Sequence, residues 1–134
     1  MVVMNAATSI ITTKSPYLAR TSLTTPQLNY TLGTWAAKNG IKKIYTMVSD
    51  YGPGIDAETW FQKGFKDSGG EIVGSVRFPV ANPDFSVFVQ RAKDASPDAI
   101  CVWLPGGRSR RRSARRLRSA EWIPRRRKSW VRTH

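Results

Sequence analysis

The stretch "IKKIYTMVSDYGPGIDAETWFQKGFKDSGGEIVGSVRFP", residues 41–79, decides the fold because its hydrophobic pattern changes period twice. Residues 41–49 form a mostly apolar run, which is typical of a buried strand. Residues 55–67 place apolar side chains at helical spacing, and a Gly-Gly pair follows as a helix end. Residues 71–79 return to a strand pattern. The stretch therefore predicts a strand, a helix and a second strand.

The same alternation continues on both sides of this stretch. Before it, residues 24–40 carry helix signals, with Thr24 or Thr25 as the cap and a glycine at the end. After it, residues 82–95 predict a helix and residues 98–105 a further strand. Strands that alternate with helices through short loops form right-handed βαβ units. We therefore expect an α/β fold with a partial, doubly wound parallel sheet.

The spacing of the apolar residues also predicts which face of each helix is buried. Large aromatic side chains at these positions are interpreted as core and not as parts of a binding site. The predicted inner positions are Leu28, Leu32, Trp35 and Ala36 in the first helix, Ile55, Trp60, Phe61 and Phe65 in the second, and Phe85, Phe88, Val89 and Ala92 in the third.

Two loops are expected at the edge of the sheet where ligands bind in open parallel sheets, outside the carboxyl ends of the strands. They are "NAATS" (5–9), after an N-terminal apolar run that predicts the end of a strand, and "SDYGPG" (49–54), after the central strand. Gly52, Gly54 and Ala57 also match the spacing of a dinucleotide-binding loop. A nucleotide-binding domain stays open as an alternative, although no carboxylate ends the next strand to hold a ribose.

The residue inventory excludes several kinds of catalysis. Cys101 is the only cysteine and His134, the only histidine, is the terminal residue, so Ser/His/Asp and Cys/His triads are not expected. The apolar run around Cys101 indicates a buried structural thiol. No apolar run approaches the roughly 20 residues that span a bilayer. We expect a protein that is not an enzyme and has no metal, cofactor or catalytic residue.

The order of the segments resembles that of one known family. It is carried by "NAATS", "SPYLART", "KKIYTMVSDYGPGIDAETWFQKGFKDSGGEIVG" and "NPDFSVFVQRAKDASPDAICVW", in this order. The chain resembles the type I periplasmic solute-binding proteins, and among them the leucine/isoleucine/valine-binding receptors of ABC transporters, over residues 1–107. The resemblance implies a two-lobed receptor, in which residues 1–20 end the first lobe and include the hinge, and residues 21–107 open the second lobe.

The resemblance implies partners and a location as well. The family binds small solutes that carry an amino-acid-like or carboxylate head group, and it delivers them to the membrane permease of an ABC importer. Its members are periplasmic. The segment "MVVMNAATSIITTK" lacks a basic region ahead of its apolar residues, so we do not expect it to act as a secretory signal.

The resemblance also implies site residues. Ala6, Ala7 and Thr8 match the loop that holds the head group, and Tyr51 matches the tyrosine that covers the solute from the opposite lobe. Small residues let main-chain N–H groups reach an anion, and Thr8 adds a hydroxyl. Asp50 either binds an amine or stabilises its loop. The alternatives are that Thr8 makes only turn hydrogen bonds and that Tyr51 only packs at the lobe surface.

Residues 108–134 differ in composition from the rest of the chain. They hold twelve Lys and Arg against one acidic residue, whereas residues 1–107 hold ten against eight. Their apolar residues are scattered among arginines, which predicts a disordered tail. Two interpretations stay open. The tail is either a basic arm that binds polyanions such as nucleic acid without sequence preference, or the product of a frameshift.

Overall fold

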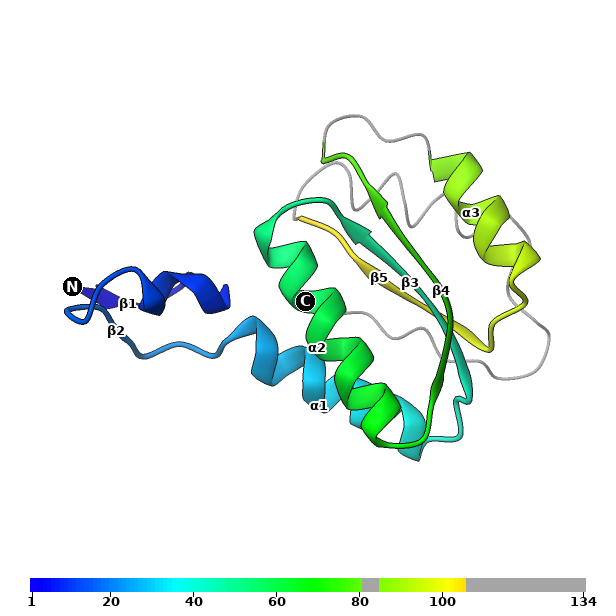
Figure 1. Ribbon diagram of the computed structural model, residues 1–134, viewed down its shortest axis with the longest axis horizontal. Helices are drawn as coiled ribbons and strands as arrows, with labels where there is room; N and C mark the ends of the chain where they lie inside the picture. The colour runs from blue at the N-terminus through cyan, green and yellow to red at the C-terminus, as the bar shows by residue number, and fades with distance from the viewer. Residues whose placement is uncertain (81–84, 106–134) are drawn as a thin grey trace.

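The computed structural model describes residues 1–80 and 85–105 and has an α/β fold, as predicted. Three parallel strands form the main sheet, and three helices pack on it (Figure 1). The strands are β3 (Lys43–Ser49), β4 (Glu71–Phe78) and β5 (Ala99–Trp103). The helices are α1 (Thr25–Lys38), α2 (Gly52–Asp67) and α3 (Phe85–Asp94). The strand order β4-β3-β5 is the order in which a doubly wound sheet begins.

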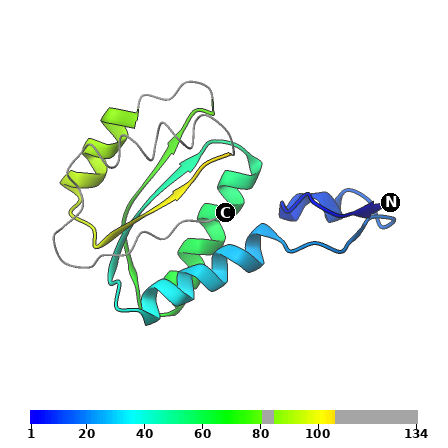
Figure 2. The same ribbon diagram turned by 180° about the vertical axis from the view of Figure 1, so that it is seen from behind.

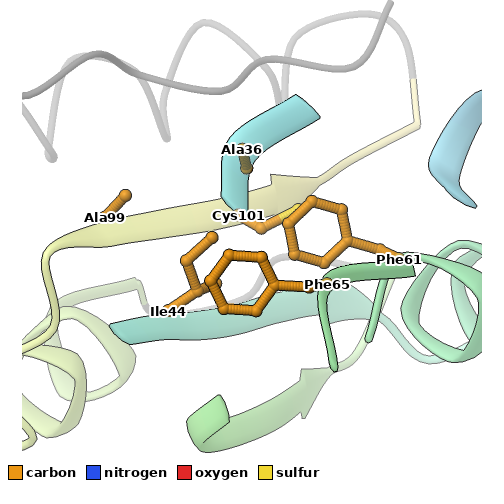
Figure 3. Packing of buried hydrophobic residues seen from close by; sticks show 6 residues of the cluster. All are labelled: Ala36, Ile44, Phe61, Phe65, Ala99 and Cys101. Atoms are coloured by element: carbon orange, nitrogen blue, oxygen red, sulfur yellow. The ribbon is translucent and has the colours of Figure 1, made fainter. Parts of the chain in front are cut away.

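The helices cover both faces of the sheet. Helices α1 and α2 lie on one face and α3 lies on the other (Figures 1 and 2). Successive residues of β3 point to opposite faces, so Ile44 packs toward α1 and α2 whereas Tyr45 packs toward α3. The cluster under α1 and α2 is drawn in Figure 3 and comprises Ala36, Ile44, Phe61, Phe65, Ala99 and Cys101.

Helix α1 begins and ends at the residues that the sequence predicts. The Thr24 hydroxyl accepts a hydrogen bond from the Gln27 amide, and the Gln27 side chain accepts one from the Thr24 amide. This capping box satisfies two amides at the start of the helix. Past the other end, Gly40 has a φ of 81°, a conformation that glycine adopts without steric cost.

The predicted inner face of α1 is wrong in part. Leu28 and Trp35 are 44% and 46% exposed, whereas small and polar residues lie inside. The reason is a very close crossing of α1 and α2. A methyl group on Gly33 would collide with the Phe61 carbonyl oxygen, and one on Gly64 with the Tyr30 carbonyl oxygen. The buried positions of α1 are therefore Thr25, Asn29, Gly33 and Ala36.

Helix α2 begins at Gly52, earlier than the predicted start at residue 55. The cause is Gly54, because a methyl group there would collide with the Ser49 carbonyl oxygen, so glycine lets the helix start directly against the end of β3. Phe61 and Phe65 are buried as predicted, but Ile55 is 37% exposed and Trp60 is half-buried.

The N-terminal segment forms a small separate unit beside α1 and α2 (Figure 1). Strand β1 (Val2–Val3) confirms the predicted strand and pairs in parallel with β2 (Ala19–Arg20). Between them lie the "NAATS" loop and a short 3-10 helix, η1 (Ser9–Thr13). Neither β2 nor η1 is predicted by the sequence patterns. Residues 21–24 connect this unit to α1.

Some predictions concern residues outside the described ranges. They include the start of the third helix at residues 82–84 and the basic tail, residues 108–134. For Phe85, the first residue of α3, the side chain is likewise not described. Phe88 is half-buried, and Val89 and Ala92 are buried, as predicted.

Candidate solute-binding site

The "NAATS" loop is held to the protein through its carbonyl groups. The Ala7 carbonyl oxygen accepts a hydrogen bond from the Thr25 amide at 2.8 Å, and the Thr8 carbonyl oxygen accepts one from Arg20 Nη2 at 2.5 Å. Within residues 1–80 and 85–105, the amides of Ala6, Ala7 and Thr8 donate no hydrogen bond. The loop therefore presents main-chain donors at a place where its carbonyl groups are already used.

The side chains of the loop bind a carboxylate on helix α2. Asp56 Oδ2 lies 2.8 Å from Thr8 Oγ1 and 2.7 Å from the Ser9 amide nitrogen. Ser9 Oγ lies 2.8 Å from Asp56 Oδ1 and 2.9 Å from Oδ2. These partners are 47 and 48 residues from Asp56 along the chain. The hydroxyl of Thr8 thus makes a long-range contact and not the local turn hydrogen bond of the alternative interpretation.

The electrostatics of this cluster favour the ionised form of Asp56. Partial burial alone would raise the pKa of Asp56, but the hydrogen bonds from Ser9 and Thr8 and the charge of Arg20 outweigh burial. The pKa of Asp56 therefore lies below its ordinary value. The Asp56 side chain is a carboxylate at neutral pH and accepts the hydrogen bonds that Thr8 and Ser9 donate to it.

Tyr51 is the N-cap residue of α2, two residues after the end of β3. Its ring centroid lies 5.6 Å from that of Trp103, at the carboxyl end of β5, with an interplanar angle of 52°. The ring is half-buried, and burial raises the pKa of Tyr51. Tyr51 and Trp103 thus form an aromatic pair at the edge of the sheet where ligands are expected.

Asp50 lies beside Tyr51 but is held only by its backbone. Its amide donates to the Phe78 carbonyl oxygen at 2.8 Å, which ties the end of β3 to the end of β4. The carboxylate is exposed. In the part of the chain that the structure describes, no hydrogen bond uses the Asp50 side chain, so it is accessible to a ligand.

The structure brings the predicted site residues to one end of α2, but not into mutual contact. Thr8 reaches Asp56, within two turns of Tyr51, while Ala6 is exposed. The sequence interpretation missed Asp56 and the role of Arg20. The one signal for Asp56 in the sequence is its position: it follows the glycines at the start of the helix, and the other carboxylate, Asp50, precedes them.

The glycine spacing of the loop is explained by packing. Gly54 is required where α2 meets the Ser49 carbonyl oxygen, whereas Gly52 has open space around it. Gly54 is thus needed for the packing of α2 against the end of β3. The glycine spacing therefore gives no support to the hypothesis of a nucleotide-binding domain. Across the described part of the chain, no cluster of three or more His, Cys, Asp or Glu could hold a metal ion. None of its helices is long and apolar enough to cross a membrane.

An open parallel sheet with helices on both faces, and a loop of donors beside it, defines an α/β ligand-binding protein of the doubly wound class. A family model described as "Periplasmic binding protein" matches residues 1–110, and the chain belongs to that family. The family consists of solute-binding receptors and not of enzymes.

Relatives with known sequences or structures agree with this assignment. A "Leu/Ile/Val-binding protein homolog 6" of Brucella abortus is 51% identical over 107 residues, which cover 80% of this chain and 27% of the relative. The ABC-transporter solute-binding protein of Rhodopseudomonas palustris BisB5, solved with 3,4-dihydroxybenzoic acid, is 49% identical with a TM-score of 0.80. The match covers 90% of this chain and 33% of that one.

A second solute-binding protein of an R. palustris ABC transporter was solved with 4-hydroxybenzoate. It is 47% identical with a TM-score of 0.83, and the match again covers 90% of this chain and 33% of that protein. The chain thus spans about a quarter to a third of the length of the relatives it matches.

Proposed function

We propose that the chain belongs to the solute receptor of an ABC importer and contributes one wall of the pocket from each of two lobes. Residues 1–20 form the end of the first lobe with the hinge, and residues 21–107 form the opening part of the second. The membrane partner is the permease of the importer, and the compartment is the periplasm. Membership of the periplasmic binding protein family supports this assignment.

The observation that carries the proposal is the way the "NAATS" loop is held. The carbonyl oxygens of Ala7 and Thr8 accept hydrogen bonds from the protein, so the amides of Ala6, Ala7 and Thr8 are the groups left for a solute. A row of amide donors binds an anion as a set of fixed partial charges. The head group that fits is a carboxylate.

Tyr51 covers the rest of the solute in this proposal. Its ring meets that of Trp103, and such a pair offers apolar area to a flat or branched solute body. The exposed carboxylate of Asp50 lies at the rim, where it suits a solute amine or hydroxyl. The solute is therefore a small carboxylate with an apolar body, either an aromatic acid or a branched-chain amino acid.

The solved relatives favour the aromatic acids. Both R. palustris receptors described above hold hydroxylated benzoates and share nearly half of their aligned residues with this chain. The Brucella relatives are named for leucine, isoleucine and valine. We therefore place 4-hydroxybenzoate and 3,4-dihydroxybenzoate first and the branched-chain amino acids second.

Isothermal titration of a chimera tests the proposal. In this chimera, residues 1–105 replace the matching segment of the R. palustris BisB5 receptor, so that the relative supplies the remaining parts of both lobes. We expect binding of a hydroxybenzoate and a loss of at least tenfold in affinity for Tyr51→Ala. Failure to bind any carboxylate, or binding that Tyr51→Ala leaves unchanged, contradicts the proposed site.

A further inference from the structure

We propose that Asp56 is the positioning residue of the solute loop. Its carboxylate, carried on α2, accepts hydrogen bonds from Thr8 and Ser9, and we call this set of contacts the clasp. The clasp fixes the "NAATS" loop against the helix whose N-cap is Tyr51. That this loop meets a solute rests on the proposed function. The clasp itself rests on the geometry of Asp56 and does not need a solute to be tested.

The direction of the hydrogen bonds separates Asp56 from an ordinary helix cap. A carboxylate near a helix N-terminus usually accepts hydrogen bonds from the amides of its own helix. Asp56 instead accepts from two hydroxyls and one amide of another segment. The N-cap of α2, Tyr51, makes no side-chain cap hydrogen bond either. The carboxylate therefore serves the loop and not the helix that carries it.

The loop, in turn, depends on this distant carboxylate. Helix η1 begins at Ser9, and its own N-cap residue, Thr8, makes no side-chain cap hydrogen bond. The Ser9 amide would then lack an acceptor inside its helix. Asp56 Oδ2 supplies that acceptor at 2.7 Å. The start of η1, and with it the conformation of the preceding loop, is held from α2.

A second contact fixes the loop from the other helix. The Thr25 amide, at the start of α1, donates to the Ala7 carbonyl oxygen. Three consecutive loop residues, Ala7, Thr8 and Ser9, are thus held by the N-terminal ends of two helices. Arg20 completes the cluster, because it binds the Thr8 carbonyl oxygen and its charge acts on Asp56.

The clasp also sets what Thr8 offers to a solute. A hydroxyl has one proton, and the proton of Thr8 is donated to the ionised Asp56. Only the lone pairs of Thr8 Oγ1 are then left for a solute, so this atom accepts a hydrogen bond from the solute and does not donate one. A carboxylate head group must therefore use the main-chain amides, whereas an ammonium or hydroxyl can use Thr8.

Amide hydrogen exchange of the 134-residue chain tests the clasp without a solute. In Asp56→Asn, the Ser9 amide loses its charged acceptor, and we expect its exchange to accelerate at least tenfold. Ser9→Ala removes one hydroxyl donor and keeps the Ser9 amide, so we expect a smaller acceleration there. NMR of the Asp56 carboxyl carbon against pH should give a titration midpoint below the ordinary range of aspartate. In Ser9→Ala, this midpoint should be higher than in the unchanged chain.

Asp67→Asn is the matched control. Asp67 is on the same helix and accepts a hydrogen bond from Tyr30 Oη at 3.1 Å, far along α2 from the loop. We expect this variant to leave the exchange of the Ser9 amide unchanged. Unchanged exchange in Asp56→Asn, or an ordinary titration of Asp56, overturns the clasp. Either result leaves the proposed solute binding to be judged separately by the chimera.

Discussion

Cys101 lies on β5 and shares a buried cluster with the phenyl rings of Phe61 and Phe65, as the apolar run around it predicts (Figure 3). Burial raises the pKa of its thiol to about 12. Only the thiolate is nucleophilic, so a thiol with this pKa is inert at neutral pH. Its packing, and not its chemistry, explains its place in the core.

We expect Cys101 to resist thiol reagents in the folded chain. At pH 8, a disulfide reagent such as dithionitrobenzoate should label less than a tenth of the protein in the time that labels free cysteine completely. Labelling should become complete in denaturant, which serves as the control. Rapid stoichiometric labelling under native conditions would show that this face of β5 is open.

Asp56 makes the stability of the fold depend on pH. Its pKa is lower in the folded chain than in the unfolded chain, so its contribution is fully present above the unfolded value of about 4. The contribution is lost as the pH falls through the lower, folded pKa. The difference in unfolding free energy between the wild type and Asp56→Asn should be constant near pH 7 and shrink below pH 4.

Urea denaturation between pH 3 and pH 7 measures this difference. The control places Asp56→Asn in a background of Thr8→Val and Ser9→Ala, which removes the hydroxyl donors. There the pH dependence of the difference should be smaller. A difference that grows as the pH falls would mean that Asp56 is destabilised in the folded chain.

At the scale of single residues, the sequence predicts the loop but not its partner. Thr8 and Tyr51 stand out because small residues and an aromatic residue follow predicted strand ends. Asp56 does not stand out, since a carboxylate in the first turns of a helix is common for local electrostatic reasons. Its contacts lie 47 and 48 residues away and arise only when the N-terminal segment meets α2.

Among the elements, α1 and α2 cross so closely that their backbones are in contact. Gly33 and Gly64 bring the backbone of each helix against that of the other. Because the obstacle is backbone and not a flexible side chain, the helices must separate if either position gains a side chain.

Gly33→Ala should therefore destabilise the chain by about 1–3 kcal/mol, as overpacking does in other cores. Gly52→Ala is the control, because it places a methyl group in open space in the same helix pair. We expect Gly52→Ala to be neutral or to stabilise the fold by up to about 1 kcal/mol. Urea denaturation of both variants gives the comparison, and equal effects would mean that the crossing is looser than described.

Helix α2 is also fixed to strand β4 by a buried carboxylate. Glu58, whose side chain is 8% exposed, binds Arg77 Nε at 2.7 Å and the Ser75 hydroxyl. Glu58→Ala should cost about 1–3 kcal/mol, because it removes two hydrogen bonds to a charged and buried carboxylate. The control is Glu71→Ala, because Glu71 forms a 3.9 Å ion pair with Lys43 on the surface. Exposed pairs contribute less than about 1 kcal/mol, and a similar loss in both variants would contradict the buried role of Glu58.

The elements themselves are well predicted by the sequence, and their packing less so. Capping residues, glycines and periodicity act locally, which is why the ends of α1 and the strands β3, β4 and β5 agree with the predictions. The inner face of α1 is mispredicted because hydrophobicity favours Leu28 and Trp35. The close crossing selects small residues instead, and that crossing is a property of two helices together. Strand β2 is missed because two paired residues carry no periodicity.

For the whole molecule, the uneven charge predicts a second kind of binding. Residues 108–134 hold twelve basic residues and one acidic residue, so the 134-residue chain should bind DNA or RNA without sequence preference. Raising the salt concentration from about 50 to 200 mM should weaken this binding by at least tenfold, because counterions are released on binding. Fluorescence anisotropy with two unrelated oligonucleotides measures it.

A chain that ends at Gly107 is the control for this binding. With ten basic and eight acidic residues, it should not bind either oligonucleotide at physiological salt. Retained binding, or a clear preference for one sequence, would place nucleic-acid recognition in the α/β part of the chain and favour that function over solute binding.

The contact between Gly33 and Gly64 bears on how the molecule can move. Helix α1 binds Ala7 through Thr25, and helix α2 binds the next two residues through Asp56. The backbones of the two helices are in contact at their crossing, so neither helix can move toward the other. The two helices thus hold the loop as one body. If the N-terminal unit rotates about the connecting residues 21–24, it must either break its hydrogen bonds to one of the helices or move both helices with it.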